Sequence, residues 1–110
     1  MQLSSYGTEG AQVVRVEEDR IDAAVAIQFK ERMREIAQGG RIILDLGRVA
    51  FVDSSGLGAI VAVMKFLAPA GKLELAALTP NVGKVFHMTR MDSVFTILPA
   101  APGRGQDHAA

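Results

Sequence analysis

An α/β fold with a mostly parallel sheet of four to five strands is the fold class that this sequence predicts. Short apolar runs typical of strands alternate with amphipathic stretches typical of helices, in the order strand, helix, strand, helix, strand, helix, strand. A glycine pair and a Thr-Pro pair stand at segment boundaries, where turns and helix starts are needed. Helices between successive strands indicate right-handed crossovers and therefore parallel neighbours.

The first part of the chain predicts two strands and a long helix. Residues 12–17 have a strand pattern, and the glycines before them allow a hairpin to a short strand at residues 3–6, which would make the sheet mixed. Asp22 is the expected N-cap of a helix that runs to about Gln38, and Gly39-Gly40 ends it. The apolar residues of this helix recur at helical spacing: Val25, Phe29, Met33 and Ile36.

The second part of the chain repeats the alternation of strand and helix. Its first strand is an apolar run typical of a buried parallel strand. Its last helix begins at Thr79-Pro80, where a cap residue precedes a proline in the first turn. The expected strands are residues 41–46, 72–78 and 94–98. One expected helix begins near Ser55 and comprises residues 56–68, and the other comprises residues 81–90.

The length of 110 residues corresponds to one domain. We expect this single domain to span residues 1–98, since the sequence contains no internal repeat or linker. Residues 99–110 contain prolines and glycines and show no apolar periodicity. They are therefore expected to form a disordered C-terminal tail.

The composition argues against several classes of function. Twelve Lys+Arg balance twelve Asp+Glu, unlike the basic surface of a nucleic-acid binder or an electrostatic membrane anchor. The chain has no cysteine and two histidines, His87 and His108, so we expect no metal site and no cofactor. The N-terminus lacks a signal-peptide pattern, and the longest apolar stretch, residues 57–70, is too short to span a membrane. We therefore expect a cytoplasmic protein.

The segment Phe51-Val-Asp-Ser-Ser-Gly-Leu-Gly58 carries most of the functional information. It follows the expected central strand, and sites in parallel sheets gather at the carboxyl ends of strands. Asp, Ser and Gly are favoured at helix starts, so a well-capped helix alone would explain the segment. A helix N-terminus also favours an anion, so a serine here can carry a phosphate without breaking the fold. Together with Asp53, that phosphate would concentrate negative charge at this position and disrupt a binding surface.

The helix after this segment is apolar on two faces. One face is sufficient to pack on the sheet and consists of Leu57, Ile60, Val61, Met64 and Ala68. The opposite face, which is usually polar on a surface helix, carries Ala59, Ala62, Val63 and Phe66. Such a face predicts a docking surface for a different protein, although another helix or a second copy of the chain would also cover it. We expect a monomer or a weak dimer.

The motif Asp53-Ser-Ser-Gly-Leu-Gly58, after the strand Ile42-Ile-Leu-Asp-Leu46 and before a helix, resembles the signature of the STAS-domain anti-sigma-factor antagonists. The resemblance extends from about Val13 to Leu98, with Ile21-Asp22 at the entry to the family's first helix. It implies a STAS-like fold, in which a mixed, mostly parallel sheet of four to five strands is accompanied by about four helices. One departure is Glu17-Glu-Asp-Arg20, which stands where the family often has a glycine.

The resemblance also implies partner switching and no enzymatic activity. In the family, the unphosphorylated antagonist binds an anti-sigma factor that is also a serine kinase, and the sigma factor is released. The kinase uses ATP to phosphorylate the antagonist, and a PP2C-type phosphatase reverses the reaction. Some relatives use the same switch on other targets, such as secretion or signalling regulators. On this sequence the implied phosphoacceptor is Ser54, and the implied kinase-contacting loop is Asp53, Ser54, Ser55, Gly56, Leu57 and Gly58.

Two alternatives fit the residues less well. A receiver domain would use the acidic residues 17–19 with Asp53 and Thr79, but no lysine follows the last expected strand, and the chain is one α/β unit short. A serine hydrolase would need a general base beside Ser54 or Ser55, and the Gly-x-Ser-x-Gly spacing is absent. The residues alone do not choose between the two serines as phosphoacceptor, and that choice depends on the resemblance.

Overall fold

The main sheet of the computed structural model, which describes residues 1–103, has five strands in the order β1-β2-β4-β6-β7. β1 and β2 form an antiparallel hairpin, and the other pairs are parallel. The expected mixed, mostly parallel sheet is therefore confirmed, including the N-terminal hairpin. The strands are β1 (Leu3–Thr8), β2 (Ala11–Val16), β4 (Arg41–Asp45), β6 (Lys72–Ala76) and β7 (Ile97–Leu98).

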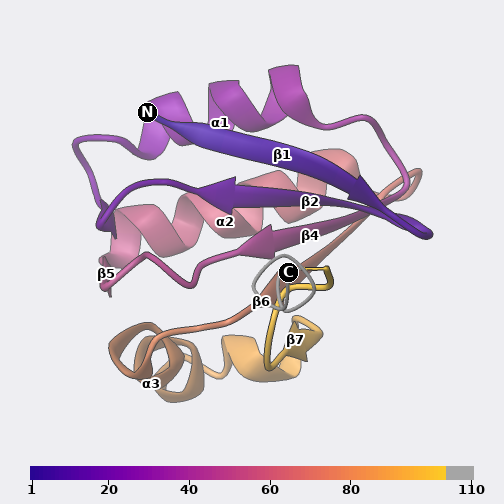
Figure 1. Ribbon diagram of the computed structural model, residues 1–110. Helices are drawn as coiled ribbons and strands as arrows, with labels where there is room; N and C mark the ends of the chain where they lie inside the picture. Colours follow the sequence, from indigo (N-terminus) through magenta and orange to yellow (C-terminus); the bar gives the residue numbers. More distant parts are fainter. Residues whose placement is uncertain (104–110) are drawn as a thin grey trace.

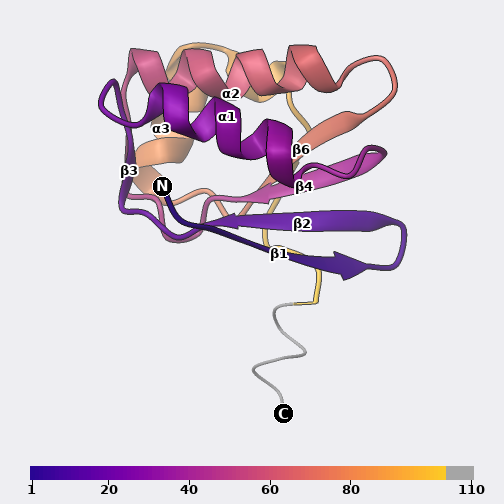
Figure 2. The same cartoon turned by 90° about the horizontal axis from the view of Figure 1, so that it is seen from above.

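Three α-helices occur in the part of the chain that the structure describes: α1 (Ala26–Ile36), α2 (Ser54–Leu67) and α3 (Pro80–Met88). α1 and α2 lie side by side over one face of the sheet (Figures 1 and 2). The expected number of about four helices is one too high for residues 1–103, because the described residues after α3 add a 3-10 turn, η1 (Met91–Ser93), and no further α-helix. Arg90, with a left-handed φ of 61°, separates this turn from α3.

Successive side chains along each strand point to opposite faces of the sheet, and each face carries an apolar cluster. On one face, Ile42 and Leu44 belong to a large core with Phe29 of α1 and Ile60 of α2. On the other face, the smaller cluster of Val13, Ile43 and Ala76 is covered by Ala101. Because β4 is buried on both faces, its sequence is an almost continuous apolar run.

The residues that follow β7 lie on this second face of the sheet. The Tyr6 hydroxyl donates a hydrogen bond of 2.7 Å to the Pro102 carbonyl, and Ala101 is buried. Residues 99–103, which the sequence assigns to a disordered tail, thus pack against the sheet. The remainder of that expected tail, residues 104–110, lies outside the described residues.

A second, two-stranded sheet contacts α2 and α3. It pairs β3 (Arg20–Ile21) with β5 (Phe51–Val52) in parallel, with Arg20 opposite Phe51 and Ile21 opposite Val52. Two-residue strands are too short to produce an apolar period, so the sequence did not predict them. α2 begins two residues after β5, so this small sheet positions the N-terminus of α2.

The first helix is shorter than expected at both ends. Asp22 does not cap it: one of its oxygens accepts a hydrogen bond of 3.1 Å from the Ala24 N–H, and residues 22–25 form a turn before the helix. At the other end, the Gln38 N–H donates to the Gln12 side chain at 2.9 Å instead of continuing the helix. Tertiary hydrogen bonds therefore set both boundaries.

The last two strands are also shorter than expected. β6 ends at Ala76 because Ala77 takes a positive φ of 60°. β7 begins at Ile97 because the Val94 N–H donates to the Met91 carbonyl at 3.0 Å as part of the 3-10 turn. Phe95 then enters the core, where its ring meets that of Phe86 edge to face at 5.9 Å.

Candidate functional site

The N-terminus of α2 is fixed by the carboxylate of Asp53, its N-cap. One oxygen accepts a hydrogen bond of 2.8 Å from the Gly56 N–H, and the other accepts one of 3.1 Å from the Ala23 N–H. The Asp53 N–H also donates to the Ile21 carbonyl at 3.3 Å. Asp53 thus holds the first turn of α2 to β3 and to the turn that precedes α1. Because both oxygens are engaged by backbone N–H groups, the geometry gives Asp53 a positioning role.

The same contacts explain the ionisation of this carboxylate. The Gly56 hydrogen bond is the main cause that holds the pKa of Asp53 below its usual range, while partial desolvation opposes it. The Ala23 hydrogen bond and the positive charge of Arg20 add to the lowering of the pKa. The cap is therefore a charged carboxylate at neutral pH, as the positive end of a helix favours.

The lowered pKa predicts a pH-dependent contribution of Asp53 to stability. The folded state binds the proton less tightly than the unfolded state, so the contribution is complete above the unfolded pKa of about 3.9 and is lost as the pH falls through the lower folded pKa. We expect Asp53→Asn to be less stable than the wild type at neutral pH, with a difference that shrinks below about pH 4. Urea unfolding of both proteins across this pH range measures it. A difference that stays constant with pH would contradict the assignment.

Gly56 is required by a close backbone approach. A Cβ built at this position would overlap the Ile21 carbonyl, so α2 could not lie this near β3 with any other residue. Gly58, two residues along the same helix, has open space around the corresponding position. The motif therefore combines one sterically required glycine with one that sterics leave free.

Ser54 and Ser55, the first two residues of α2, are both exposed. Within residues 1–103, neither hydroxyl makes a hydrogen bond to another protein group. The hydroxyls therefore extend from a helix turn that Asp53 and Gly56 fix in place. The geometry favours neither serine over the other.

Two apolar side chains near this turn are more exposed than is usual for large hydrophobic residues. Phe51 of β5 is 44% exposed, and Ile27 in the first turn of α1 is 67% exposed. Asp53 connects the two elements through its bond to Ala23, so both residues belong to the end of the molecule that carries the serines. Neither residue stands out in the sequence as a site residue, and the only sequence signal is the position of Phe51 at the start of the segment 51–58.

The expectation of an exposed outer face on α2 is wrong for two of its four residues. Ala59 is 3% exposed and Val63 is fully buried, because both lie with Gly56 and Ile60 on the side of α2 that faces the core. Ala62 and Phe66 are partly exposed, and the Arg34 guanidinium lies 4.2 Å from the centre of the Phe66 ring. Two of the four residues of the second apolar face are thus buried within the chain, and Phe66 contacts Arg34 of α1.

The acidic residues of the receiver alternative do not gather around Asp53. Glu17 pairs with Arg15 at 2.9 Å, and the nearest cation to Asp19 is Arg48 at 3.8 Å. Thr79 donates to the Val49 carbonyl at 2.7 Å. Among residues 1–103 there is no group of three or more acidic, histidine or cysteine side chains placed to hold a metal ion.

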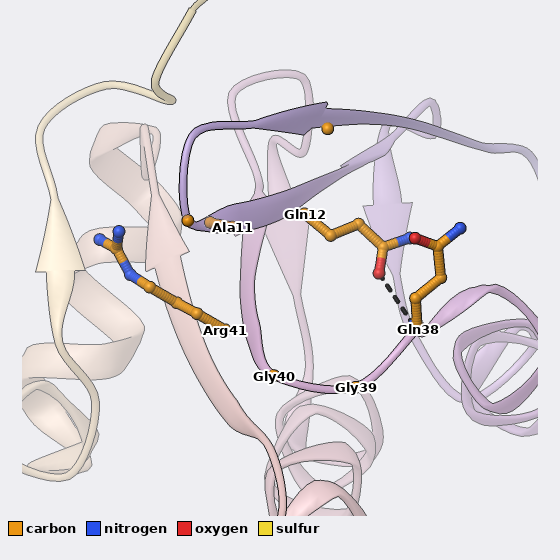
Figure 3. Close-up of a pocket in the computed structure, with 8 residues that line it drawn as sticks. Ala11, Gln12, Gln38, Gly39, Gly40 and Arg41 are labelled. Carbon is orange, nitrogen blue, oxygen red and sulfur yellow. Dashed lines mark hydrogen bonds between the residues drawn. The ribbon is translucent and has the colours of Figure 1, made fainter.

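A shallow pocket of about 270 Å³ lies at the opposite end of α1 and β4 from the serines. The Gln12 amide there donates to Ser5 and to the Ile36 carbonyl and accepts from Gln38, so it fastens the end of α1 (Figure 3). Arg41 extends away from these two glutamines and donates two hydrogen bonds to Glu74, at 2.9 and 3.0 Å. The polar groups of this pocket are therefore used in structural contacts.

Comparison with known proteins identifies the family. A model of the STAS domain matches residues 2–101, nearly the entire chain. The chain belongs to the STAS-domain family. None of the helices in the described part of this STAS domain is long and apolar enough to cross a membrane.

Individual relatives agree with this assignment. The chain is 32% identical over 80 residues to BtrV of Bordetella bronchiseptica, a putative anti-sigma factor antagonist; the match covers 72% of this chain and 64% of BtrV. An anti-sigma factor antagonist from Mycobacterium paratuberculosis has the same fold, with a TM-score of 0.78 and 23% identity over 90% of this chain and 86% of that one. The unphosphorylated anti-sigma factor antagonist SpoIIAA gives a TM-score of 0.70 and 26% identity over 98% of this chain and 96% of that one. The phosphorylated form of Bacillus SpoIIAA gives a TM-score of 0.63 and 22% identity over 99% and 100%.

Proposed function

We propose that this STAS domain is an anti-sigma-factor antagonist that acts by partner switching in the cytoplasm. Its unphosphorylated form binds an anti-sigma factor that is also a serine kinase, and the sigma factor is released. ATP-dependent phosphorylation of Ser54 ends this binding, and a PP2C-type phosphatase restores it. The chain acts as a regulator and not as an enzyme. The observation that carries the proposal is the exposed Ser54 hydroxyl on a helix turn that Asp53 and Gly56 hold rigidly.

The relatives support this proposal. BtrV and SpoIIAA are both described as anti-sigma factor antagonists, and SpoIIAA occurs in unphosphorylated and phosphorylated forms. The choice of Ser54 over Ser55 follows from the resemblance of the Asp53–Gly58 motif to the family signature. The partner is expected to contact this loop, Phe51 and Ile27.

The expected mechanism of the switch is electrostatic. A phosphate adds about −1.5 to −2 charges, which a partner surface matched to a neutral hydroxyl and apolar neighbours would leave unpaired. The fold itself tolerates the charge, because the N-terminus of α2 favours an anion. Phosphorylation therefore changes what the surface binds while the domain stays folded.

Substitutions at Ser54 test the proposal. We expect Ser54→Ala to bind the kinase and Ser54→Asp to bind it at least about 100-fold more weakly, the factor that about 3 kcal/mol gives. Both baits are used to capture partners from a lysate of the source organism, and the captured kinase is purified for calorimetric titration. With ATP, that kinase should phosphorylate the wild type and the Ser55→Ala variant but not Ser54→Ala.

Three results would contradict the proposal: equal affinity of the kinase for both variants, capture of no ATP-binding serine kinase, or phosphate transfer that depends on Ser55. Far-UV circular dichroism is the folding control, and Ser54→Asp should keep the wild-type spectrum. The protein that competes with this chain for the kinase identifies the target. A competitor other than a sigma factor would assign the same switch to a secretion or signalling regulator.

A further inference from the structure

Two contacts hold Arg20 near the first turn of α2. This turn carries Ser54 and Ser55 and is called the serine turn below. In the small sheet it stands opposite Phe51, and its guanidinium carbon lies 4.8 Å from the centre of the Phe51 ring. Its Nε also lies 3.0 Å from a carboxylate oxygen of Asp22. A cation over an aromatic ring and against a carboxylate has a restricted position, although the side chain remains largely exposed.

The alternation of the short strands directs Arg20 toward the serine turn. Ile21 and Val52 are buried in the core, so their neighbours Arg20, Phe51 and Asp53 lie on the opposite, outward side. The positive charge of Arg20 is close enough to lower the pKa of Asp53, the residue directly before Ser54. Arg48, another arginine beside an aspartate, lies 3.8 Å from Asp19.

We propose that Arg20 is the cation that receives the phosphate when Ser54 is phosphorylated. This inference depends on the proposed function, because it concerns the phosphorylated state of the same site. The contact with Asp22 is made by Nε, and a guanidinium carries further N–H donors in a planar fork, a geometry that suits a phosphate. Phe51 supports the guanidinium from its face, so the fork is positioned before the phosphate arrives.

This pairing would hold the phosphate on the surface of the chain itself. Because the Arg20 side chain is 61% exposed, a phosphate bound to it would stay accessible to solvent and to a phosphatase, with part of its charge neutralised by a cation of the same chain. Arg20 would thereby stabilise the released state, which makes it a positioning residue of the switch. The negative charges of Asp22 and Asp53 repel the phosphate, and Asp22 also competes for Arg20. The strength of the pairing therefore depends on the attraction of Arg20 relative to these repulsions.

The second ionisation of the phosphate measures the contact. Phosphoserine is incorporated at position 54 of the full chain by genetic code expansion, and its ³¹P resonance is followed through a pH titration. A bound cation favours the doubly charged phosphate, so its pKa should be lower with Arg20 than in Arg20→Gln, by about 0.2–0.7 unit for an exposed ion pair. Arg48→Gln is the matched control, since it also removes one arginine beside an aspartate, and it should leave the pKa unchanged.

Equal phosphate pKa values in the wild type and Arg20→Gln would overturn the proposal. An equal rise of the phosphate pKa in Arg48→Gln would also overturn it. The pKa would then depend on the overall positive charge of the protein and not on a contact with Arg20. Amide spectra of each variant confirm that the domain is folded. Since the phosphoserine is installed without a kinase, failure here leaves the kinase-binding test of Ser54 untouched, and failure of that test leaves this titration interpretable.

Discussion

Replacing Gly56 by alanine is expected to destabilise the protein by at least about 2 kcal/mol. The added methyl group would overlap the Ile21 carbonyl, which is backbone and cannot turn aside as a flexible side chain does. Relief requires α2 to move away from β3, and this motion would stretch the hydrogen bonds of Asp53 to Ile21 and Ala23. Urea unfolding followed by circular dichroism gives the change in the free energy of unfolding.

Gly58→Ala is the matched control for this substitution. It makes the same chemical change in the same helix, but apart from its chain neighbours and the backbone of its own helix no atom lies within 4 Å of the added group. Alanine is the better helix former, so we expect Gly58→Ala to leave stability unchanged or to raise it by up to about 1 kcal/mol. Similar losses in the two variants would mean that the close approach to Ile21 does not explain the glycine at position 56, because helix propensity alone favours alanine at both positions.

Phe86→Ala is expected to lower the free energy of unfolding by about 3–5 kcal/mol. Phe86 is fully buried in α3, and its ring meets that of Phe95 at 5.9 Å, so truncation leaves a cavity between α3 and the segment that leads to β7. Met88→Ala, two residues along the same helix but 73% exposed, should change stability by less than about 0.5 kcal/mol. The unfolding midpoints of the two variants provide the comparison. A small loss in Phe86→Ala would mean that α3 contributes little to the cooperative core.

The α/β class and the sheet were predictable because they depend on local patterns. The apolar run of β4, the Thr79-Pro80 start of α3 and the glycines before β2 act within a few residues. The boundaries were less predictable because partners distant in sequence decide them. Gln12 ends α1 from 26 residues away, and Asp53 holds Ala23 from 30 residues away.

The serine motif was found from sequence because its residues are adjacent in the chain. The residues around the motif were not found from the sequence. Arg20 lies near it because β3 pairs with β5, and Ile27 lies near it because Asp53 bonds to Ala23, just before α1. The docking face assigned to Ala59 and Val63 failed for a related reason. A helix that is apolar on two sides has two neighbours, and periodicity does not reveal whether the second is a partner or, as here, the core of the same chain.

The strand order β1-β2-β4-β6-β7 is also the order in which the strands are synthesised. Within the main sheet, each strand after β1 therefore finds its pairing partner already made, and none has to insert between two strands that are paired. β3, β5 and the first turn of α2 all precede β6 in the chain, so the serine turn can form while the C-terminal third is still being made. Such a topology suits assembly from the N-terminus onward, with residues 99–103 closing the second face of the sheet last.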